Sequence, residues 1–272
     1  MRIAFIGGGH MTTSLVGGLR ARGAAAEDLC VSDPVVAQRE RLEFDFGVRT
    51  TPANPDAIRE ADLVVLAVKP QDMAAAAQSI AAELATRRRI VVSIAAGIRV
   101  ANLRHWLGSD TAVVRTMPNR PALIGAGITA ACAGPGIDHA DRAAVERVLA
   151  TAGPLVWLDD ESQMDVVTAV SGSGPAYVFY FIEALQNSGT ALGLPAETAR
   201  LLAIETFLGA ARLAEASNEP VDDLRMRVTS KGGTTAAAIE VFNTEAVDAA
   251  IAKGVEAAAA RGRELCDILG QD

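Results

Sequence analysis

Residues 2–13 read Arg2-Ile-Ala-Phe-Ile-Gly-Gly-Gly-His-Met-Thr-Thr13. The apolar residues at the start are typical of a buried parallel strand, and a helical segment follows the glycines. Gly7 and Gly9 fill the first two positions of the pattern Gly-x-Gly-x-x-Gly/Ala, where glycine permits a tight turn and a close approach of pyrophosphate to the backbone. Thr12 stands in the third position, where the pattern has a smaller residue. The stretch predicts a dinucleotide-binding turn; an ordinary glycine turn between a strand and a helix is the alternative.

Size and charge are compatible with this prediction. The chain has 272 residues, 50% of them hydrophobic and 21% charged, which suits a globular protein with two substantial cores. Its net charge of -8 argues against nucleic-acid and anionic-membrane partners, because both need clustered lysine and arginine. We therefore expect any phosphate site to be local.

Cysteine usage and the start of the chain point to the cytoplasm. Cys30, Cys132 and Cys266 are far apart and odd in number, so we expect neither a disulfide framework nor a metal site. The first strand begins at residue 2, which leaves no room for a secretory signal. The longest uncharged apolar run, residues 166–182, contains Ser-Gly-Ser-Gly-Pro and is better interpreted as a buried, kinked helix than as a membrane span.

The first half alternates strands with helices. This rhythm predicts an α/β fold with a doubly wound parallel sheet of the Rossmann type. Asn54-Pro55 is interpreted as the N-cap and first residue of a short helix. The expected strands are residues 2–6, 29–32, 48–50, 63–68, 90–94, 112–116, 128–132 and 155–158, and the longer helices are residues 35–46, 72–85, 100–107 and 138–150.

The second half contains no convincing strand. We predict an all-helical domain, and we place the boundary between a dinucleotide-binding domain of residues 1–159 and a helical domain of residues 160–272. Many alanines and few aromatic residues leave each helix a thin core, so we expect dimerisation through these helices, with a monomer of unusually alanine-rich surface as the alternative. The expected helices are residues 162–192, 195–216, 221–228, 236–242 and 245–269.

Several chemistry-bearing segments follow predicted strands, at the edge where open α/β sheets bind ligands. These are residues 67–70, 95–97 and 115–119. Lys69 precedes a proline and is expected to contribute its extended backbone rather than catalysis. Asn119 either binds a substrate or organises its own turn.

Two segments interrupt the helical half with glycines and hydroxyl residues. Val228-Thr-Ser-Lys-Gly-Gly-Thr-Thr235 offers backbone N–H groups at the start of a helix, which suits a carboxylate. A plain loop with a threonine cap is the alternative, although two glycines and three threonines exceed what capping requires. Val170-Ser-Gly-Ser-Gly-Pro-Ala-Tyr177 is either a helix kink with self-satisfied hydroxyls or a ligand-facing segment.

Taken together, these segments resemble the pyrroline-5-carboxylate reductase family. The resemblance spans essentially the whole chain, and the order and spacing of the segments carry it. It implies a Rossmann domain, a helical dimerisation domain whose dimers often form larger rings, and NAD(P)H-dependent reduction of 1-pyrroline-5-carboxylate to L-proline.

The resemblance, together with the carboxylate at the end of the second strand, predicts the site residues. The predicted cofactor-binding residues are Ile6, Gly7, Gly8, Gly9, His10, Met11, Asp33, Asn54, Ala67, Val68, Lys69, Pro70, Ala95, Ala96 and Gly97. The predicted substrate-binding residues are Ser230, Gly232, Gly233, Thr234 and Thr235, of which Thr235 is nearest the ring nitrogen and is the predicted catalytic residue. No strong general acid is expected, because a cyclic imine arrives largely protonated near neutral pH.

The sequence departs from the family's commoner pattern at His10, Thr12, Arg120 and Lys231. Two features of the sequence point to different cofactors. Asp33 ends the second strand, where a carboxylate suits the ribose of NAD, yet the resemblance favours NADPH. We expect both cofactors to be used, with NADPH slightly preferred.

Two rival functions differ in testable ways. A β-hydroxyacid dehydrogenase shares the architecture but needs a lysine about one helical turn after its Gly-x-Gly, where this chain has Val178. A non-catalytic redox sensor or binding protein would keep the glycine turn and the helical dimer face but would have no need of the site at residues 232–235.

Overall fold

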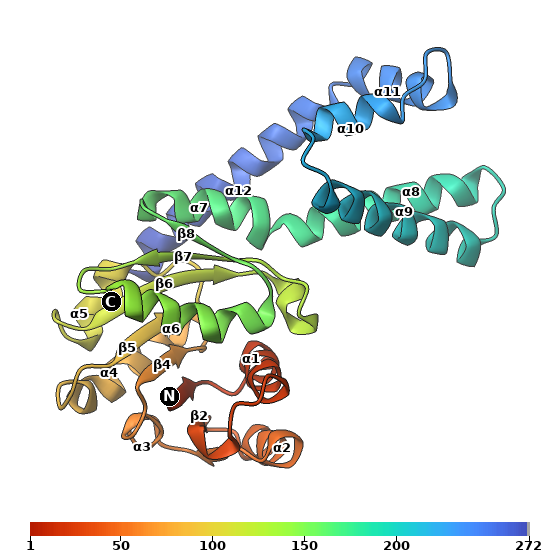
Figure 1. Cartoon of the computed structure of the whole chain (residues 1–272). Helices are drawn as coiled ribbons and strands as arrows, with labels where there is room; N and C mark the ends of the chain where they lie inside the picture. Colours follow the sequence, from red (N-terminus) through yellow and green to blue (C-terminus); the bar gives the residue numbers. More distant parts are fainter. Residues whose placement is uncertain (271–272) are drawn as a thin grey trace. The chain divides into compact units, whose positions relative to one another are not determined.

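The first half of the chain builds one sheet. The computed structural model describes residues 1–270, and within them the sheet has the strand order β3-β2-β1-β4-β5-β6-β7-β8 (Figure 1). In this doubly wound order, β2 and β3 lie on one side of β1 and the later strands lie on the other side. The strands are β1 (Ile3–Ile6), β2 (Leu29–Ser32), β3 (Arg49–Thr51), β4 (Leu63–Leu66), β5 (Ile90–Ser93), β6 (Ala112–Pro118), β7 (Thr129–Ala133) and β8 (Leu155–Leu158).

Helices cover both faces of this sheet. Alternate strand residues point to opposite faces, so Ile3 and Phe5 join a core with α1, α2 and α6, while Ala4 and Ile6 join a core with α3, α4 and α5. All four side chains are at most 3% exposed, which explains why the strand is apolar throughout. The helices are α1 (His10–Ala21), α2 (Val36–Phe46), α3 (Asn54–Ile58), α4 (Met73–Leu84), α5 (Val100–Leu107) and α6 (His139–Leu149).

One strand runs against the predicted direction. β7 pairs antiparallel with β6, whereas the other neighbouring strands pair in parallel. The connection between β6 and β7 is residues 119–128 and contains only the short 3-10 helix η3 (Arg120–Ile124). A parallel crossover needs a dozen or more residues, so this chain segment turns back instead.

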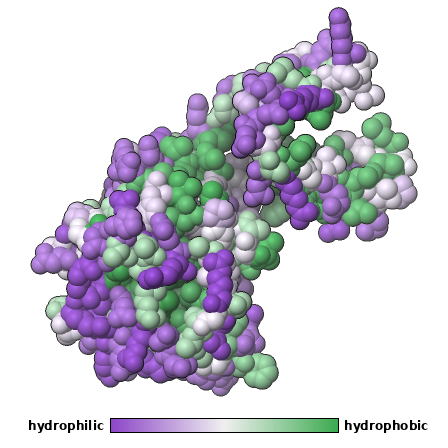
Figure 2. Space-filling view, viewed as in Figure 1, coloured by the Kyte–Doolittle hydropathy of each residue, from purple (hydrophilic) through white to green (hydrophobic). Residues whose placement is uncertain are grey.

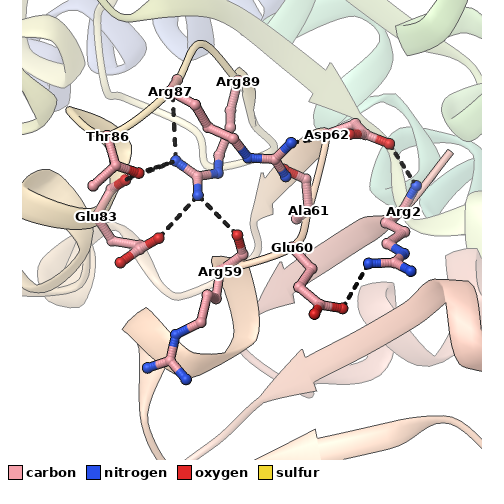
Figure 3. A network of polar contacts seen from close by, with 9 residues as sticks. All are labelled: Arg2, Arg59, Glu60, Ala61, Asp62, Glu83, Thr86, Arg87 and Arg89. Atoms are coloured by element: carbon pink, nitrogen blue, oxygen red, sulfur yellow. Dashed lines mark hydrogen bonds and ion pairs between the residues drawn. The ribbon is translucent and has the colours of Figure 1, made fainter.

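An arginine-rich network closes the opposite edge of the sheet, where β1, β4 and β5 begin (Figure 3). The guanidinium of Arg89 is almost completely buried and pairs with Glu83 at 3.0 Å. It also donates to the backbone carbonyl of Arg59 at 3.0 Å, and Arg87 donates to the carbonyl of Ala61. These bonds tie the loop before β5 to the end of α3, so they serve the fold at the edge away from the glycine turn.

The remainder of the described chain is helical, as predicted. A five-residue π-helix, η6 (Thr168–Gly172), interrupts the first helical segment. Gly193, with φ of 102°, lies in the turn that follows α8. Pro195 precedes α9 and Pro220 precedes α10. The helices are α7 (Met164–Val167), α8 (Gly174–Ala191), α9 (Ala196–Ala216), α10 (Val221–Arg227), α11 (Thr234–Thr244) and α12 (Val247–Leu269).

By internal contacts, the chain divides into two compact units. The first comprises Met1–Ser173 with Ala258–Asp272, and the second comprises Gly174–Ala257. The predicted boundary between residues 159 and 160 differs from this division, because residues 160–173 and the end of α12 pack with the sheet. Contacts and secondary-structure content are different criteria for a domain, so the boundary stays a prediction.

The second unit exposes many apolar side chains (Figure 2). Phe179 on α8 and Leu201 on α9 are 63% and 60% exposed. Such a surface is typical of a unit that is covered by another chain. Within the described residues, none of the helices is long and apolar enough to cross a membrane, and residues 166–182 fall in the interrupted helical segment around η6.

Candidate active site

The glycine turn after β1 has the geometry that the motif predicts. Gly7 has φ of 101°, and a Cβ atom there would lie 2.7 Å from the carbonyl oxygen of Ala67. Only glycine fits this position without strain. Gly9 precedes α1 with no side-chain cap, and a Cβ atom there would meet nothing within 4 Å. The backbone at the start of α1 is therefore open to an approaching pyrophosphate, as a dinucleotide site requires.

Thr12 explains how the turn tolerates a larger third residue. Its side chain is fully buried, and its hydroxyl donates to the carbonyl oxygen of Gly7 at 2.5 Å. This hydrogen bond ties the first turn of α1 to the glycine turn. Thr12 is therefore compatible with the predicted turn.

A hollow of about 560 Å³ opens beside this turn. Its walls come from the turn, the ends of β2 and β4, and the starts of α3 and α4. The predicted cofactor residues that line it are Gly7, Gly9, Asp33, Asn54, Ala67, Val68 and Lys69. Sequence reasoning missed six lining residues, Ser32, Pro34, Val35, Asp72, Ala75 and Ala76. Ser32 and Pro34 flank the predicted residue Asp33, and Ala75 and Ala76 lie in the first turn of α4. Nearness in the sequence to predicted residues was the signal that could have found them.

The other predicted cofactor residues have different surroundings. Ile6 is fully buried in the core, and Met11 packs against the other core cluster. His10 is exposed and lines a separate hollow with Ile124. The residues that do not line the hollow beside the turn are Ile6, Gly8, His10, Met11, Pro70, Ala95, Ala96 and Gly97.

Asp33 builds the turn that follows β2. Its Oδ2 accepts the Gly8 N–H at 2.7 Å, and its Oδ1 accepts the Val35 N–H at 2.8 Å. Both carboxylate oxygens are thus engaged by backbone donors. Asp33 links the glycine turn to the turn after β2, a role that the sequence pattern did not reveal.

Asn54 is not the helix cap that the sequence suggested. It is the first residue of α3, after Ala53, and this helix start has no side-chain cap. Its amide instead accepts from the Ser32 hydroxyl and donates to the Ser79 hydroxyl at 3.0 Å. These two serines, distant in sequence, hold the Asn54 amide at the edge of the hollow.

The turn after β5 packs against the end of α12. Gly97 has φ of 77°, and a Cβ atom there would lie 3.0 Å from Cδ1 of Leu269. Nearby, buried Arg115 pairs with Glu161 at 3.0 Å and lies 3.7 Å from both Asp165 and the Sγ atom of Cys266. This network fastens α7 and α12 to β6.

The remaining polar residues of the predicted segments have mainly local partners. The Asn119 side chain accepts the Ile128 N–H at 3.0 Å, which agrees with the turn-organising alternative. Ser171 donates to the Val167 carbonyl at 3.1 Å within the π-helix, so its hydroxyl is self-satisfied. Within the described residues, the buried hydroxyl of Tyr177 has no hydrogen-bond partner.

The loop before α11 keeps its two last threonines free. Thr229 donates to the Arg225 carbonyl at 2.6 Å, and the Gly233 N–H bonds to the Ser230 carbonyl at 3.0 Å. α11 nevertheless starts without a side-chain cap, and within the described chain no hydrogen bond involves the hydroxyls of Thr234 or Thr235. The backbone amides at this helix start are thus not capped by either threonine.

The cysteines do not form a reactive centre. Cys30, Cys132 and Cys266 are buried free thiols, and burial raises the pKa of each. Among the described residues, no group of three histidine, cysteine or carboxylate side chains could hold a metal ion.

Comparisons with known proteins agree with this architecture. A family model described as "pyrroline-5-carboxylate reductase dimerisation" matches residues 161–265. A second model, described as "NADP oxidoreductase coenzyme F420-dependent", matches residues 2–97. The pyrroline-5-carboxylate reductase of Pseudomonas aeruginosa is 45% identical over 99% of this chain and 98% of its own length. That of Vibrio alginolyticus is 41% identical over 97% of both chains.

Two solved structures are similar over nearly the whole fold. The pyrroline-5-carboxylate reductase of Coxiella burnetii is 38% identical with a TM-score of 0.94, covering 97% of this chain and 98% of its own. Plasmodium falciparum pyrroline carboxylate reductase, with NADP bound, is 27% identical with a TM-score of 0.86, covering 98% of each. Fold and glycine turn define a dinucleotide-binding oxidoreductase with a helical dimerisation domain. The chain belongs to the pyrroline-5-carboxylate reductase family.

Proposed function

We propose that this chain reduces 1-pyrroline-5-carboxylate to L-proline with NADPH, and that it also accepts NADH. The observation that carries the proposal is the uncapped start of α11 with its free threonine hydroxyls, in a chain of this family. The residue that precedes the helix is Gly233, which has no side chain to cap it, so the first amides of α11 stay available to an anion.

We assign the dinucleotide to the hollow beside the glycine turn. The open backbone at Gly9 and the start of α1 would receive the pyrophosphate, and Asn54 and Lys69 would border the rest of the cofactor. When bound, NADPH supplies the hydride that reduces the imine carbon. The predicted contacts of Ile6, Gly8, His10, Met11, Pro70 and residues 95–97 remain part of this proposal.

We assign the substrate to the loop before α11. The amides after Gly232 and Gly233 would hold the substrate carboxylate, because the positive end of the helix dipole favours an anion there. The Thr235 hydroxyl would orient the ring nitrogen, with Ser230 and Thr234 completing the loop. No histidine, aspartate or glutamate lies within residues 229–235, so the chain positions the reactants rather than supplying a proton.

The assembly and location belong to the same proposal. The exposed apolar side chains of Gly174–Ala257 support a homodimer through the C-terminal helices, and a ring of dimers is its further extension. Three buried free thiols support a cytoplasmic location, where thiols stay reduced.

The activity is tested by following reduced-nicotinamide absorbance with purified protein and 1-pyrroline-5-carboxylate. Thr235→Ala should lower kcat by roughly 10-fold or more, since it removes a hydroxyl that orients the reacting ring. Thr235→Ser should recover much of the activity. The matched control is Thr244→Ala at the other end of α11, whose hydroxyl bonds to the Glu240 carbonyl at 2.9 Å and which should behave as wild type. The function would be rejected if folded wild-type protein showed no loss of reduced-nicotinamide absorbance when 1-pyrroline-5-carboxylate is added.

A further inference from the structure

The turn after β2 borders the hollow where the ribose of a dinucleotide lies in this type of fold. Asp33, Pro34 and Val35 line the hollow, and Lys69 lines it from the end of β4. A carboxylate at this point suits an unphosphorylated ribose, whereas an arginine nearby accommodates a 2′-phosphate. The cofactor preference therefore depends on which cation reaches this turn.

Arg39 folds back from α2 onto this turn. Its Nη1 donates to the carbonyl of Asp33 at 2.7 Å and to that of Pro34 at 3.1 Å. Both partners are neutral carbonyls. Among the described residues, the ion pairs within 4.0 Å do not include Arg39, so its positive charge is not neutralised by a carboxylate. The remaining donors of its guanidinium are free for an anion.

Arg41 has different surroundings although it is only two positions away. Residues two apart on a helix point in widely different directions. Arg41 pairs with Asp45 at 3.4 Å one turn further along α2, and it is exposed. Its charge is therefore partnered on α2 itself, which makes it a matched control for Arg39.

The carboxylate of Asp33 is engaged in building the turn itself. Each of its oxygens already accepts a backbone N–H, from Gly8 and from Val35. Backbone donors stabilise the carboxylate in this position, and Arg39 contacts the carbonyl of the same residue. The turn thus combines one anion used for its own construction with one cation that has no anionic partner.

We propose that Arg39 is the residue that recognises the 2′-phosphate of NADPH and sets the preference for NADPH over NADH. This inference rests on the proposed function, because it takes the hollow beside the glycine turn as the dinucleotide site. A guanidinium held by two carbonyls is preorganised for a phosphate, since little side-chain freedom remains to be lost on binding.

The test uses two probes that differ only in the 2′-phosphate, adenosine 2′,5′-bisphosphate and adenosine 5′-monophosphate, titrated calorimetrically into the full-length protein. Arg39→Gln should weaken binding of the bisphosphate about 10-fold or more and leave the monophosphate within about twofold, because only one probe loses a charge-assisted contact. Arg39→Lys keeps the charge and should lose less. Arg41→Gln should bind both probes as wild type does. The ratio of kcat/KM for NADPH to that for NADH should fall in Arg39→Gln and stay unchanged in Arg41→Gln.

Three results would overturn the inference. If Arg39→Gln weakened the binding of both probes equally, Arg39 would only support the turn. Unchanged binding in Arg39→Gln, with the preference lost in Lys69→Gln, would assign the phosphate to Lys69. Wild-type protein that binds neither probe would reject the hollow as the dinucleotide site, and with it the cofactor part of the proposed function, whichever variant is used.

Discussion

Gly7 and Gly9 are glycines for different reasons, and this difference can be measured. Gly7→Ala would force a side chain into positive φ and against the Ala67 carbonyl, so it should lower the free energy of unfolding by more than about 2 kcal/mol. Gly9→Ala meets no neighbouring atom and should cost at most about 1 kcal/mol, yet its methyl group would occupy the backbone surface that receives pyrophosphate. Urea unfolding and titration with NADPH, followed by nicotinamide fluorescence, separate the two effects. A Gly9→Ala protein with wild-type NADPH affinity would contradict the proposed cofactor position.

The loop between α4 and β5 is held to α6 by a pair that should respond to pH. Arg88 bonds to both oxygens of Asp141, and this hydrogen bonding lowers the pKa of the Asp141 carboxyl below its ordinary value of 3.8. The carboxyl is easier to ionise in the folded protein, so the stabilisation is present above pH 3.8 and is lost as the pH falls through the lower folded pKa. Arg88→Ala should cost roughly 1 kcal/mol at pH 7, and the difference from wild type should shrink in acid.

Arg261→Ala serves as the control for this prediction, because Arg261 and Glu264 form an exposed pair at 2.8 Å on α12. It should change the free energy of unfolding by less than Arg88→Ala does at neutral pH. Urea unfolding measured from pH 7 down to values below pH 3.8 follows both variants through the range in which the difference should shrink. A destabilisation of Arg88→Ala that grows as the pH falls would show that the sign is wrong.

The apolar surface of the helical unit predicts that the protein is an oligomer. Multi-angle light scattering at micromolar concentration should give at least twice the chain mass of 28.2 kDa. The double substitution Phe179→Glu and Leu201→Glu places charges on the exposed apolar face of α8 and α9 and should lower the measured mass. Phe44→Glu, at a residue that is 91% exposed on α2, should leave it unchanged. A wild-type protein that elutes as a monomer would refute this prediction.

Local patterns in the sequence determined the types and approximate bounds of most elements, and also the glycine turn, because each depends on residues close together in the chain. The 3.6-residue hydrophobic periodicity alone predicts the helical second half. The spacing of Gly7 and Gly9 after an apolar strand predicts the turn. The family was also recognisable, since the order and spacing of its segments survive in the sequence. For the same reason the sequence predicted most of the glycine-turn and strand-end residues that line the hollow, namely Gly7, Gly9, Asn54, Ala67, Val68 and Lys69.

Only the tertiary structure decided how distant side chains pair. The direction of β7 depends on a connection that is too short for a crossover, and the return of α12 to the sheet depends on packing between Leu269 and the turn at Gly97. The sequence suggested that Asn54 caps a helix, but Ser32 and Ser79 engage its amide. Arg39 and Arg41 lie only two positions apart in the sequence, and the fold directs Arg39 to the turn after β2 and Arg41 to Asp45. Such pairings are set by the packing of whole elements, which no short window of sequence contains.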